Sequence, residues 1–288
     1  MRLSMNRLGA PASLPAIRPS EEHAGRDAGA PRSRGPRFMF PVPPKGHATP
    51  GFTLLELLVV ISILSVLVSL LFPTLARSKT SAKRVRCVNN LRQLGLAAQL
   101  YWDDNEGKTF RYGGSASRNG RLYWFGWMGP GNEGQRDFDA TEGKLYPYLK
   151  GRGVELCPAL DYFLSSLKLK ATSATYGYGY NFFLSAPVTD PPINVTHLKR
   201  YSETACFADA AQVNTWQSPA SPSNPMLEEW YYIDDSVSQP NGHFRHNRGA
   251  NVVFCDGHVG WERFVADSLD PRMPSQLVGR FRDEILKR

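Results

Sequence analysis

The sequence lacks the short motifs that mark many enzyme active sites. Its 288 residues contain no Gly-x-Ser-x-Gly elbow, no His-Glu-x-x-His pair and no glycine-rich phosphate loop. Cysteine is also scarce, because the chain has only 4, and no two of them form a Cys-x-x-Cys pair. That spacing argues against a zinc ribbon and against a thioredoxin-like redox site. We therefore expect a protein that is not an enzyme.

The few cysteines leave two interpretations open. They are Cys87, Cys157, Cys206 and Cys255. In an oxidising compartment an even number of cysteines permits disulfides, whose pairing the sequence does not fix. The alternative is that all are free and serve as small buried hydrophobic side chains.

Positive charge is in excess, but it is not spread evenly. The formal net charge is +8, and residues 1–51 hold eight Lys and Arg against three Asp and Glu, a net of +5. The remaining 237 residues (288 − 51) therefore carry about +3, which gives no reason to expect a nucleic-acid partner. Residues 1–51 are also rich in Pro, Gly, Ala and Arg and have no hydrophobic period, a composition typical of disorder.

A single long apolar run follows this basic segment. Residues 51–72 read GFTLLELLVVISILSVLVSLLF and contain one acid, Glu56. About 20 apolar residues are enough to cross a bilayer as a helix, so residues 52–72 are predicted to be transmembrane. A carboxylate within such a span costs about 2.5–3.5 kcal/mol, which suggests that Glu56 has a function. No Ala-x-Ala site follows Phe72, so an ordinary cleaved signal peptide is disfavoured.

The segment Gly51-Phe52-Thr53-Leu54-Leu55-Glu56 resembles the processing site of type IV prepilins and type II secretion pseudopilins. The resemblance implies that a prepilin peptidase cuts after Gly51, removes residues 1–51 and methylates Phe52. Glu56 would become the fifth residue of the mature chain and would pair with the N-terminal amine of a neighbouring subunit. Prepilin leaders are usually shorter, and a start at Met39 rather than Met1 would give one of more typical length. Pro50, directly before the glycine, also departs from the family pattern.

The resemblance implies a pilin-like α+β fold, in which a long N-terminal helix packs against a small antiparallel sheet. We expect the helix over residues 52–103, a head over 104–266 and a tail over 267–288 that ends in a short polar helix. Pro73 lies inside the helix, as in many pilins, and is expected to kink or loosen it during assembly. Beyond it, apolar residues recur at steps of three and four and predict a helix face that packs on the head. These residues are Val85, Val88, Leu91, Leu94, Ala98 and Tyr101.

A hairpin is the clearest element of the head. Asp256-Gly257 separates the apolar runs 250–255 and 258–262, and both turn residues tolerate positive φ. His246, nine further residues and Asp256-Gly257 also resemble the C-terminal signature of a large pseudopilin-like family. The resemblance covers about residues 51–262. Other segments that match it are Asn90–Leu96, Cys157-Pro158, Tyr178–Asn181 and Phe207–Asp209.

Two interpretations of this C-terminal constellation remain. His246, Asp256 and His258, together with Asp209, could supply ligands for calcium or another divalent metal, with His243 or Asp234-Asp235 nearby. Alternatively, Asp256-Gly257 is a structural turn, and His246 hydrogen-bonds to that turn. A catalytic use of the same residues, as in a membrane-anchored hydrolase, has the least support.

Two further groups of residues have a structural and a functional interpretation. The aromatic run of residues 123–127 either packs in the core or stacks on sugars or bases. The basic residues after the span form a solvated helix face or contact anionic lipid, and by charge alone they favour the opposite membrane orientation. These are Arg77, Lys79, Lys83, Arg84 and Arg86.

Together the motifs predict a structural subunit in the inner membrane, with its head on the periplasmic side. Its partners would be the prepilin peptidase and other pilin-like subunits, in a type II secretion or type IV pilus-like filament. The alternative is a membrane-anchored envelope module whose head binds a ligand or a metal.

Overall fold

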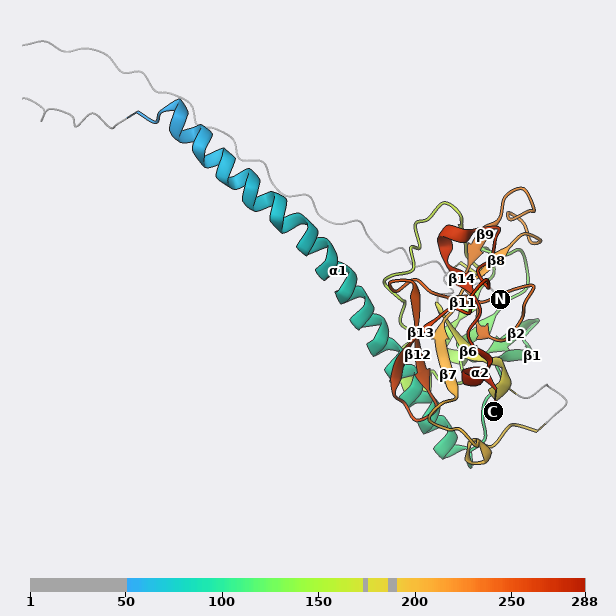
Figure 1. The fold of residues 1–288 in the computed structure, drawn as a ribbon. Coiled ribbons are helices and arrows are strands. Elements are labelled where there is room, and N and C mark those ends of the chain that lie inside the picture. The colour runs from blue at the N-terminus through green and yellow to red at the C-terminus, as the bar shows by residue number, and fades with distance from the viewer. Residues whose placement is uncertain (1–50, 173–175, 186–190, 288) are drawn as a thin grey trace, which may run out of the picture. The chain divides into compact units, whose positions relative to one another are not determined.

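The computed structural model describes residues 51–172, 176–185 and 191–287 (Figure 1). The chain divides into two units, residues 1–56 and residues 57–288. The predicted leader, including Met1, Met39 and Pro50, lies outside the described residues except for Gly51. The described residues form an α+β fold, as predicted, with one long helix followed by fourteen short strands and a short C-terminal helix.

The long helix α1 is Leu54–Asp104 and runs without interruption through Pro73. Its first half is exposed, including every large apolar residue from Leu54 to Leu75. Its second half packs on the head, as predicted, but the buried face is rotated relative to the predicted stripe. Cys87, rather than Val85, begins that face, and Val85 is 68% exposed. Leu91, Leu94 and Ala98 are buried, as the periodicity predicted.

The second half of α1 lies against strand β12 (Gly249–Phe254) at a glycine. A Cβ atom added to Gly95 would stand 2.6 Å from Cγ2 of Val253, closer than any real Cβ contact. Glycine at this position therefore allows the helix backbone to approach the sheet directly. Leu94 and Val253 belong to the same buried cluster, which forms the main core beneath α1.

The central sheet of the head has five strands in the order β10-β6-β7-β12-β13. Besides β12, these strands are β6 (Tyr178–Asn181), β7 (Ala205–Asp209), β10 (Tyr232–Ile233) and β13 (Val259–Arg263). The central sheet is antiparallel, as predicted, except at one edge, where β10 pairs with β6 in parallel. A long connection through two further strands brings β10 back to that edge, which local sequence patterns did not indicate.

Smaller sheets surround the central one. Strands β1, β2, β3 and β4 form an antiparallel meander. A second sheet, with the strand order β5-β9-β8, is mixed, and β11 and β14 form an antiparallel pair. The strands are β1 (Gly113–Ser117), β2 (Gly120–Tyr123), β3 (Gly126–Met128), β4 (Phe138–Asp139), β5 (Leu167–Lys168), β8 (Gln212–Asn214), β9 (Met226–Glu228), β11 (Gly242–His243) and β14 (Val278–Gly279). Single-turn 3-10 helices connect them at Ala140–Glu142, Pro147–Leu149, Phe182–Leu184, Val195–His197 and Pro274–Gln276.

Strands β12 and β13 form the hairpin that the sequence indicated, with Val253 opposite Val259. Its loop is longer than the predicted two-residue turn. The amide of Gly257 donates to the carbonyl of Phe254 and the amide of Phe254 donates to the carbonyl of His258, both at 2.9 Å. Only Gly257 in this loop has a positive φ, +88°, so the loop is a three-residue connection that ends in a left-handed glycine.

The last residues are part of the head rather than a polar tail. Strand β14 pairs with β11, and the short helix α2 (Asp283–Leu286) follows it. Ile285 and Leu286 of α2 are buried in a second apolar cluster on the other side of the central sheet, together with Phe244 and Phe281. Burial of these apolar side chains holds the C-terminal residues against the sheet, although most residues of that segment are polar.

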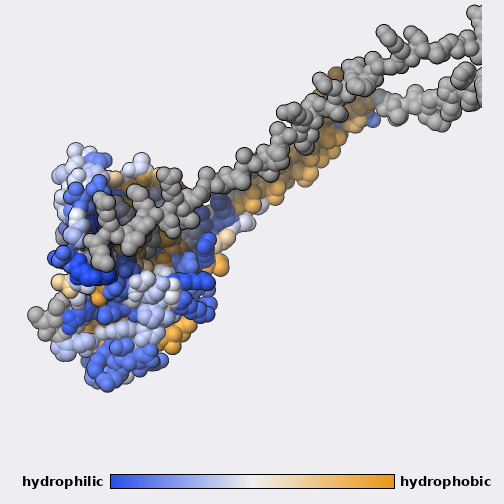
Figure 2. Space-filling model, turned by 180° about the vertical axis from the view of Figure 1, so that it is seen from behind, coloured by the Kyte–Doolittle hydropathy of each residue, from blue (hydrophilic) through white to orange (hydrophobic). Residues whose placement is uncertain are grey.

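The surface of the described residues is divided by hydropathy. Figure 2 shows apolar surface along the first half of α1, whereas the head is largely hydrophilic. By length and composition α1 is sufficient to cross a membrane. A helix with such an apolar exposed surface requires lipid or another protein around it.

Candidate functional site

The N-terminal end of α1 has the geometry of a capping box. The hydroxyl and the amide of Thr53 both donate to Oε2 of Glu56 at 2.8 Å, and Oγ1 of Thr53 accepts from the amide of Glu56 at 3.2 Å. This reciprocal pattern satisfies free backbone groups at a helix start. Gly51 and Phe52 immediately precede it and are exposed. Sequence reasoning connects Glu56 with assembly and misses this cap, although the Thr-x-x-Glu spacing is that of a capping box.

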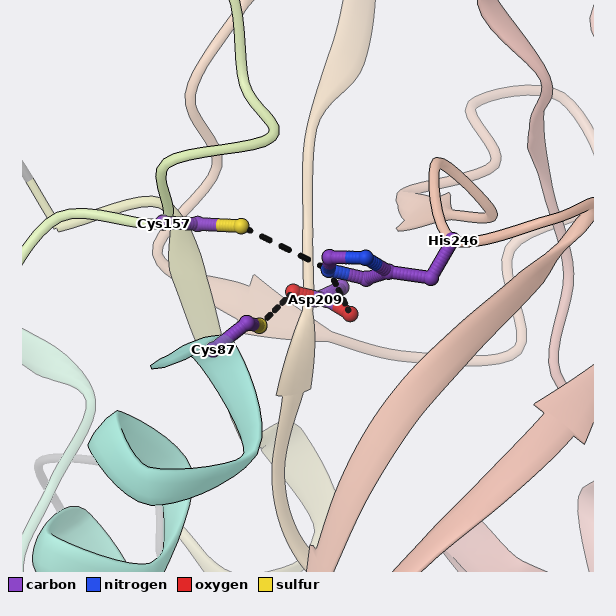
Figure 3. A group of neighbouring side chains, drawn as sticks. All are labelled: Cys87, Cys157, Asp209 and His246. Atoms are coloured by element: carbon purple, nitrogen blue, oxygen red, sulfur yellow. Dashed lines mark hydrogen bonds and ion pairs between the residues drawn. The ribbon is translucent and has the colours of Figure 1, made fainter. Parts of the chain in front are cut away.

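A second constellation is buried in the head (Figure 3). Cys87 comes from α1, Cys157 from the loop before β5, Asp209 from the end of β7 and His246 from the loop between β11 and β12. Each of these four residues offers one possible ligand atom, and the four atoms all lie within 4.8 Å of one another. All four residues are buried. Elements far apart in the sequence therefore bring two thiols, a carboxylate and an imidazole together.

Specific contacts join these four side chains. Sγ of Cys87 lies 3.1 Å from Oδ1 of Asp209, and Sγ of Cys157 lies 3.5 Å from Nε2 of His246. The same Nε2 is 3.4 Å from Oδ2 of Asp209. In Figure 3 the side chains point toward one another, and Asp209 lies between Cys87 and His246. The arrangement offers ligands to a soft or borderline cation.

Arg245 supplies the positive charge nearest to this cluster. Its Nη2 donates to Oδ1 of Asp209 at 2.7 Å, and its Nε donates to Sγ of Cys157 at 3.2 Å. The backbone amide of Asn251 donates to Oδ2 of Asp209 at 2.7 Å. Burial raises the pKa of Asp209, but Arg245 and His246 outweigh it and hold that pKa well below its usual range. The carboxylate is therefore ionised.

The two thiols differ in their environment. Burial raises the pKa of Cys157, but its contacts with Cys87 and Arg245 outweigh that effect and lower the pKa to about 4. Burial, with contributions from Cys157 and Asp209, raises the pKa of Cys87. Burial lowers the pKa of His246, yet contacts with Asp209 and Cys157 raise it to about 9. Without a metal these opposite shifts favour an ion pair between the Cys157 thiolate and the His246 imidazolium.

The predicted metal ligands separate into two pairs. His246 and Asp209 belong to the buried cluster, whereas Nδ1 of His258 lies 2.6 Å from Oδ1 of Asp256 in the half-exposed hairpin loop. The interpretation in which His246 hydrogen-bonds to the Asp256 turn is wrong, because its ring faces Asp209 and Cys157. Extended spacing along β12 places the two ends of the His-x9-Asp motif at opposite ends of one strand.

The other nearby candidates lie in separate contacts. His243 is buried, with Nδ1 2.8 Å from Nη1 of Arg245. Asp234 accepts from the side chain of Asn241 at 2.7 Å, and Asp235 pairs with Lys287 at 2.9 Å. Sequence reasoning missed Cys87, Cys157 and Arg245 as members of the cluster. Cys157-Pro158 had been noted as a motif, but nothing local connected it with His246.

All four cysteines are free thiols and are buried. Cys206 of β7 lies close to Cys255, at the start of the hairpin loop. Burial is the main cause of the raised pKa of Cys206, and the contact with Cys255 raises it further. The structure therefore agrees with the buried-thiol interpretation rather than with a disulfide.

The aromatic run is mainly part of the core. Trp124 and Phe125 are buried, and Nε1 of Trp124 donates to the carbonyl of Tyr231 at 2.8 Å. Tyr123 lies on the wall of a cavity of about 510 Å³ in the head. Rings and charged side chains line this cavity, among them Tyr123, Trp216, Trp230, Tyr231, Arg121, Arg136 and Lys170.

The basic residues that follow the apolar run are exposed, which agrees with a solvated helix face. Arg84 also contacts the head, since its Nε donates to Oδ1 of Asn251 at 3.4 Å and its guanidinium stands over the ring of Trp261 at 5.9 Å.

A buried carboxyl group adjoins the cluster through the backbone of Gly177. Oε1 of Glu229 accepts from the amide of Gly177 at 2.8 Å, and Nη2 of Arg245 donates to the carbonyl of the same residue at 2.5 Å. Oε1 also accepts from the hydroxyl of Tyr162 at 2.5 Å. Burial outweighs these donors and raises the pKa of Glu229 from 4.5 to about 7.

This raised pKa gives a prediction about stability and pH. Between pH 4.5 and 7 the carboxyl group ionises in the unfolded chain but stays protonated in the fold, so Glu229 lowers stability as the pH rises through that range. We expect Glu229→Gln, relative to wild type, to gain about 3 kcal/mol in free energy of unfolding between these limits. Urea unfolding of both proteins in detergent, from pH 4.5 to 8, measures the difference. A constant difference over that range would contradict the prediction.

Comparison with known proteins finds matches over a small part of the chain. Residues 49–72 match the family model described as the prokaryotic N-terminal methylation motif. This is a prepilin-type segment. The chain is similar to the type II secretion system core protein G of Pectobacterium carotovorum subsp. carotovorum, with 45% identity over 60 residues, 21% of this chain and 38% of the relative. It is 49% identical over 55 residues to the core protein G of Klebsiella pneumoniae, covering 19% of this chain and 39% of that protein.

The similarity does not extend through the head. The chain spans less than two fifths of the length of these curated relatives. No solved structure matches the chain. The prepilin-type segment confirms the resemblance drawn from Gly51 to Glu56, and together with the apolar surface of α1 it indicates a membrane-anchored protein. The C-terminal His-x9-Asp-Gly resemblance has no counterpart in these comparisons and stays a prediction.

Proposed function

We propose that this chain is a pseudopilin-like structural subunit, made as a precursor in the inner membrane and assembled into a filament. The observation that carries the proposal is the combination of a prepilin-type segment with a helix whose first half is apolar and uncovered. Such a helix is suited first to lipid and then to the packed centre of a helical filament. Its N-terminal relatives are secretion core proteins, which favours a type II secretion filament over a pilus.

In this proposal the processing step prepares the assembly step. A prepilin peptidase cuts between Gly51 and Phe52 and methylates the new amine of Phe52. The amine of one subunit then pairs with the Glu56 carboxylate of its neighbour, which offsets the cost of a lone charge in an apolar environment. Addition of subunits head to tail, without ring closure, yields a filament. The head remains on the periplasmic side.

The test of processing is N-terminal peptide and intact-mass analysis of the protein from its native membrane. We expect a mature chain of 237 residues (288 − 51) that begins with N-methylated Phe52. A Gly51→Val variant should accumulate as the precursor, because a branched side chain replaces the residue before the cut. Pro50→Ala is the matched control beside it and should be processed. A wild-type chain that begins at Met1 or Met39 would contradict the proposal.

A membrane-anchored envelope module is the second candidate. The observation that favours it is the cavity of about 510 Å³, because rings beside charged side chains suit a sugar or a polar ligand. The same N-terminal analysis separates the two candidates, since a display module keeps an uncleaved anchor.

A further inference from the structure

The buried cluster of Cys87, Cys157, Asp209 and His246 has the donor types of a structural zinc site. Two sulfur atoms and one imidazole nitrogen suit zinc, whereas calcium requires six to eight oxygen ligands. Four ligands from the protein complete a tetrahedron and leave no position for a substrate, which distinguishes structural from catalytic zinc. Calcium, one of the metals suggested by the sequence, does not fit this donor set.

Three contacts between these side chains are close to the donor separations of a tetrahedral site, and all four donors lie within 4.8 Å of one another. With Zn–S distances of about 2.3 Å and Zn–N or Zn–O distances of about 2.0–2.2 Å, neighbouring donors in a tetrahedron lie about 3.3–3.8 Å apart. The sulfur of Cys157 is 3.5 Å from Nε2 of His246, and that nitrogen is 3.4 Å from Oδ2 of Asp209. The sulfur of Cys87 is 3.1 Å from Oδ1 of Asp209, slightly inside this range. Small rotations of the side chains accommodate an ion.

The groups around the cluster match what a zinc site of this composition requires. Two thiolates, one carboxylate and Zn²⁺ sum to one negative charge, which the guanidinium of Arg245 balances. Its Nε donates to Sγ of Cys157, while Nδ2 of Asn251 and the hydroxyl of Tyr178 donate to Sγ of Cys87 at 3.4 and 3.5 Å. Hydrogen bonds of this kind orient metal ligands and stabilise thiolates. Binding of zinc releases the protons of the Cys87 thiol and of the His246 imidazolium, so the affinity should fall as the pH is lowered.

We propose that Cys87, Cys157, Asp209 and His246 bind one zinc ion that fastens the second half of α1 to the head. Cys87 is the ligand on the helix, and the other three come from the sheet and its loops. The ion thereby joins the membrane-anchored helix to the head through coordinate bonds as well as apolar packing. It also occupies both thiolates, which keeps them from oxidising to a disulfide.

The experiment is metal analysis of the full-length protein, purified in detergent under reducing conditions without chelators. We expect about one zinc per chain by inductively coupled plasma mass spectrometry. Replacement of zinc by Co²⁺ should give the thiolate-to-cobalt charge-transfer band and the strong visible bands of tetrahedral coordination. The Co²⁺ spectrum needs no variant, so it reports on the site even where substitutions prevent folding.

Substitutions then identify the ligands. Cys87→Ser and Cys157→Ser should each lose most of the zinc and the cobalt spectrum. Cys206→Ser is the matched control, because it makes the same change at an equally buried cysteine outside the cluster, and it should retain both. The proposal is overturned by a reduced wild-type protein that neither contains nor takes up Zn²⁺ or Co²⁺. It is also overturned by zinc retained in both ligand variants, or by a Cys87–Cys157 disulfide in protein from the native membrane.

Discussion

Glu56→Gln is expected to be processed normally at Gly51 and to fail to enter filaments. In the proposed assembly, the carboxylate of Glu56 neutralises the methylated amine of Phe52 in an adjacent subunit. A glutamine cannot do so, and the amine is left unpaired in an apolar environment. Breaking a buried charge pair costs about 3–5 kcal/mol, which corresponds to at least about a hundredfold weaker association. Sheared-filament yield, compared with cleaved protein in the membrane, measures the effect.

The capping box at the start of α1 makes glutamine the informative substitution. Glu56 accepts two hydrogen bonds from Thr53 within its own chain, so Glu56→Ala removes the cap as well as the charge. A glutamine oxygen can still accept those bonds. Thr53→Ala is the matched control, because it removes the capping hydroxyl and keeps the carboxylate. We expect Glu56→Gln and Glu56→Ala to fail and Thr53→Ala to assemble. Normal filament yield from Glu56→Gln would show that the charge is not required.

The elements that the sequence predicted well are those set by local patterns. The apolar run and its continuation predicted α1 to within two residues at each end. The apolar segments on either side of Asp256-Gly257 predicted the β12–β13 hairpin. The error in the helix face has a physical cause. A cysteine is small and weakly apolar, so Cys87 did not register in the hydrophobic period, although it is fully buried.

The buried cluster could not be predicted because its members meet only through tertiary contacts. Cys157-Pro158, Tyr178, Asp209 and His246 all belong to segments that we had noted separately as motifs. In the fold these segments surround one point beneath α1. The sequence motif joined His246 to Asp256 instead, across nine intervening residues. Spacing along a strand cannot show which side chains of other strands face a given residue.

The parallel pairings were also beyond local patterns. Strand β10 returns to the free edge of β6, and β9 pairs in parallel with β5, after connections of many residues. These short strands have only two or three residues, too few for a clear alternation. The positions of these strands depend on tertiary contacts. The pairing of β5 with β9, for example, buries a group of charged side chains.

Lys168 of β5 and Glu228 of β9 belong to a buried charged network that also contains Lys170, just after β5, and Glu133 from the loop between β3 and β4. Nζ of Lys168 lies 2.8 Å from Oε2 of Glu228, and Nζ of Lys170 lies 3.0 Å from Oε1 of Glu228. Glu133 pairs with both lysines from the other side. Burial raises the pKa of Glu228, but the two lysines outweigh burial and lower it, so the group is ionised. Arg136 also contacts Glu133 at 3.5 Å, so the carboxylates of Glu133 and Glu228 share three positive partners.

We expect Glu228→Gln to lower the free energy of unfolding by about 3–5 kcal/mol, one of the largest effects of any single substitution in the head. The substitution preserves shape and the bond from Gln212, which donates to Oε1 at 2.5 Å. It leaves two buried ammonium groups, however, with only Glu133 to balance them, and the cost of that unpaired charge is the expected loss. Urea unfolding of the full-length protein in detergent, followed by tryptophan fluorescence, measures it. Glu203→Gln is the matched control, since it breaks an exposed pair with Arg200 and should cost at most about 1 kcal/mol. If the two variants unfold alike, the network adds nothing beyond an ordinary surface pair, and the pairing of β5 with β9 must rest on apolar packing alone.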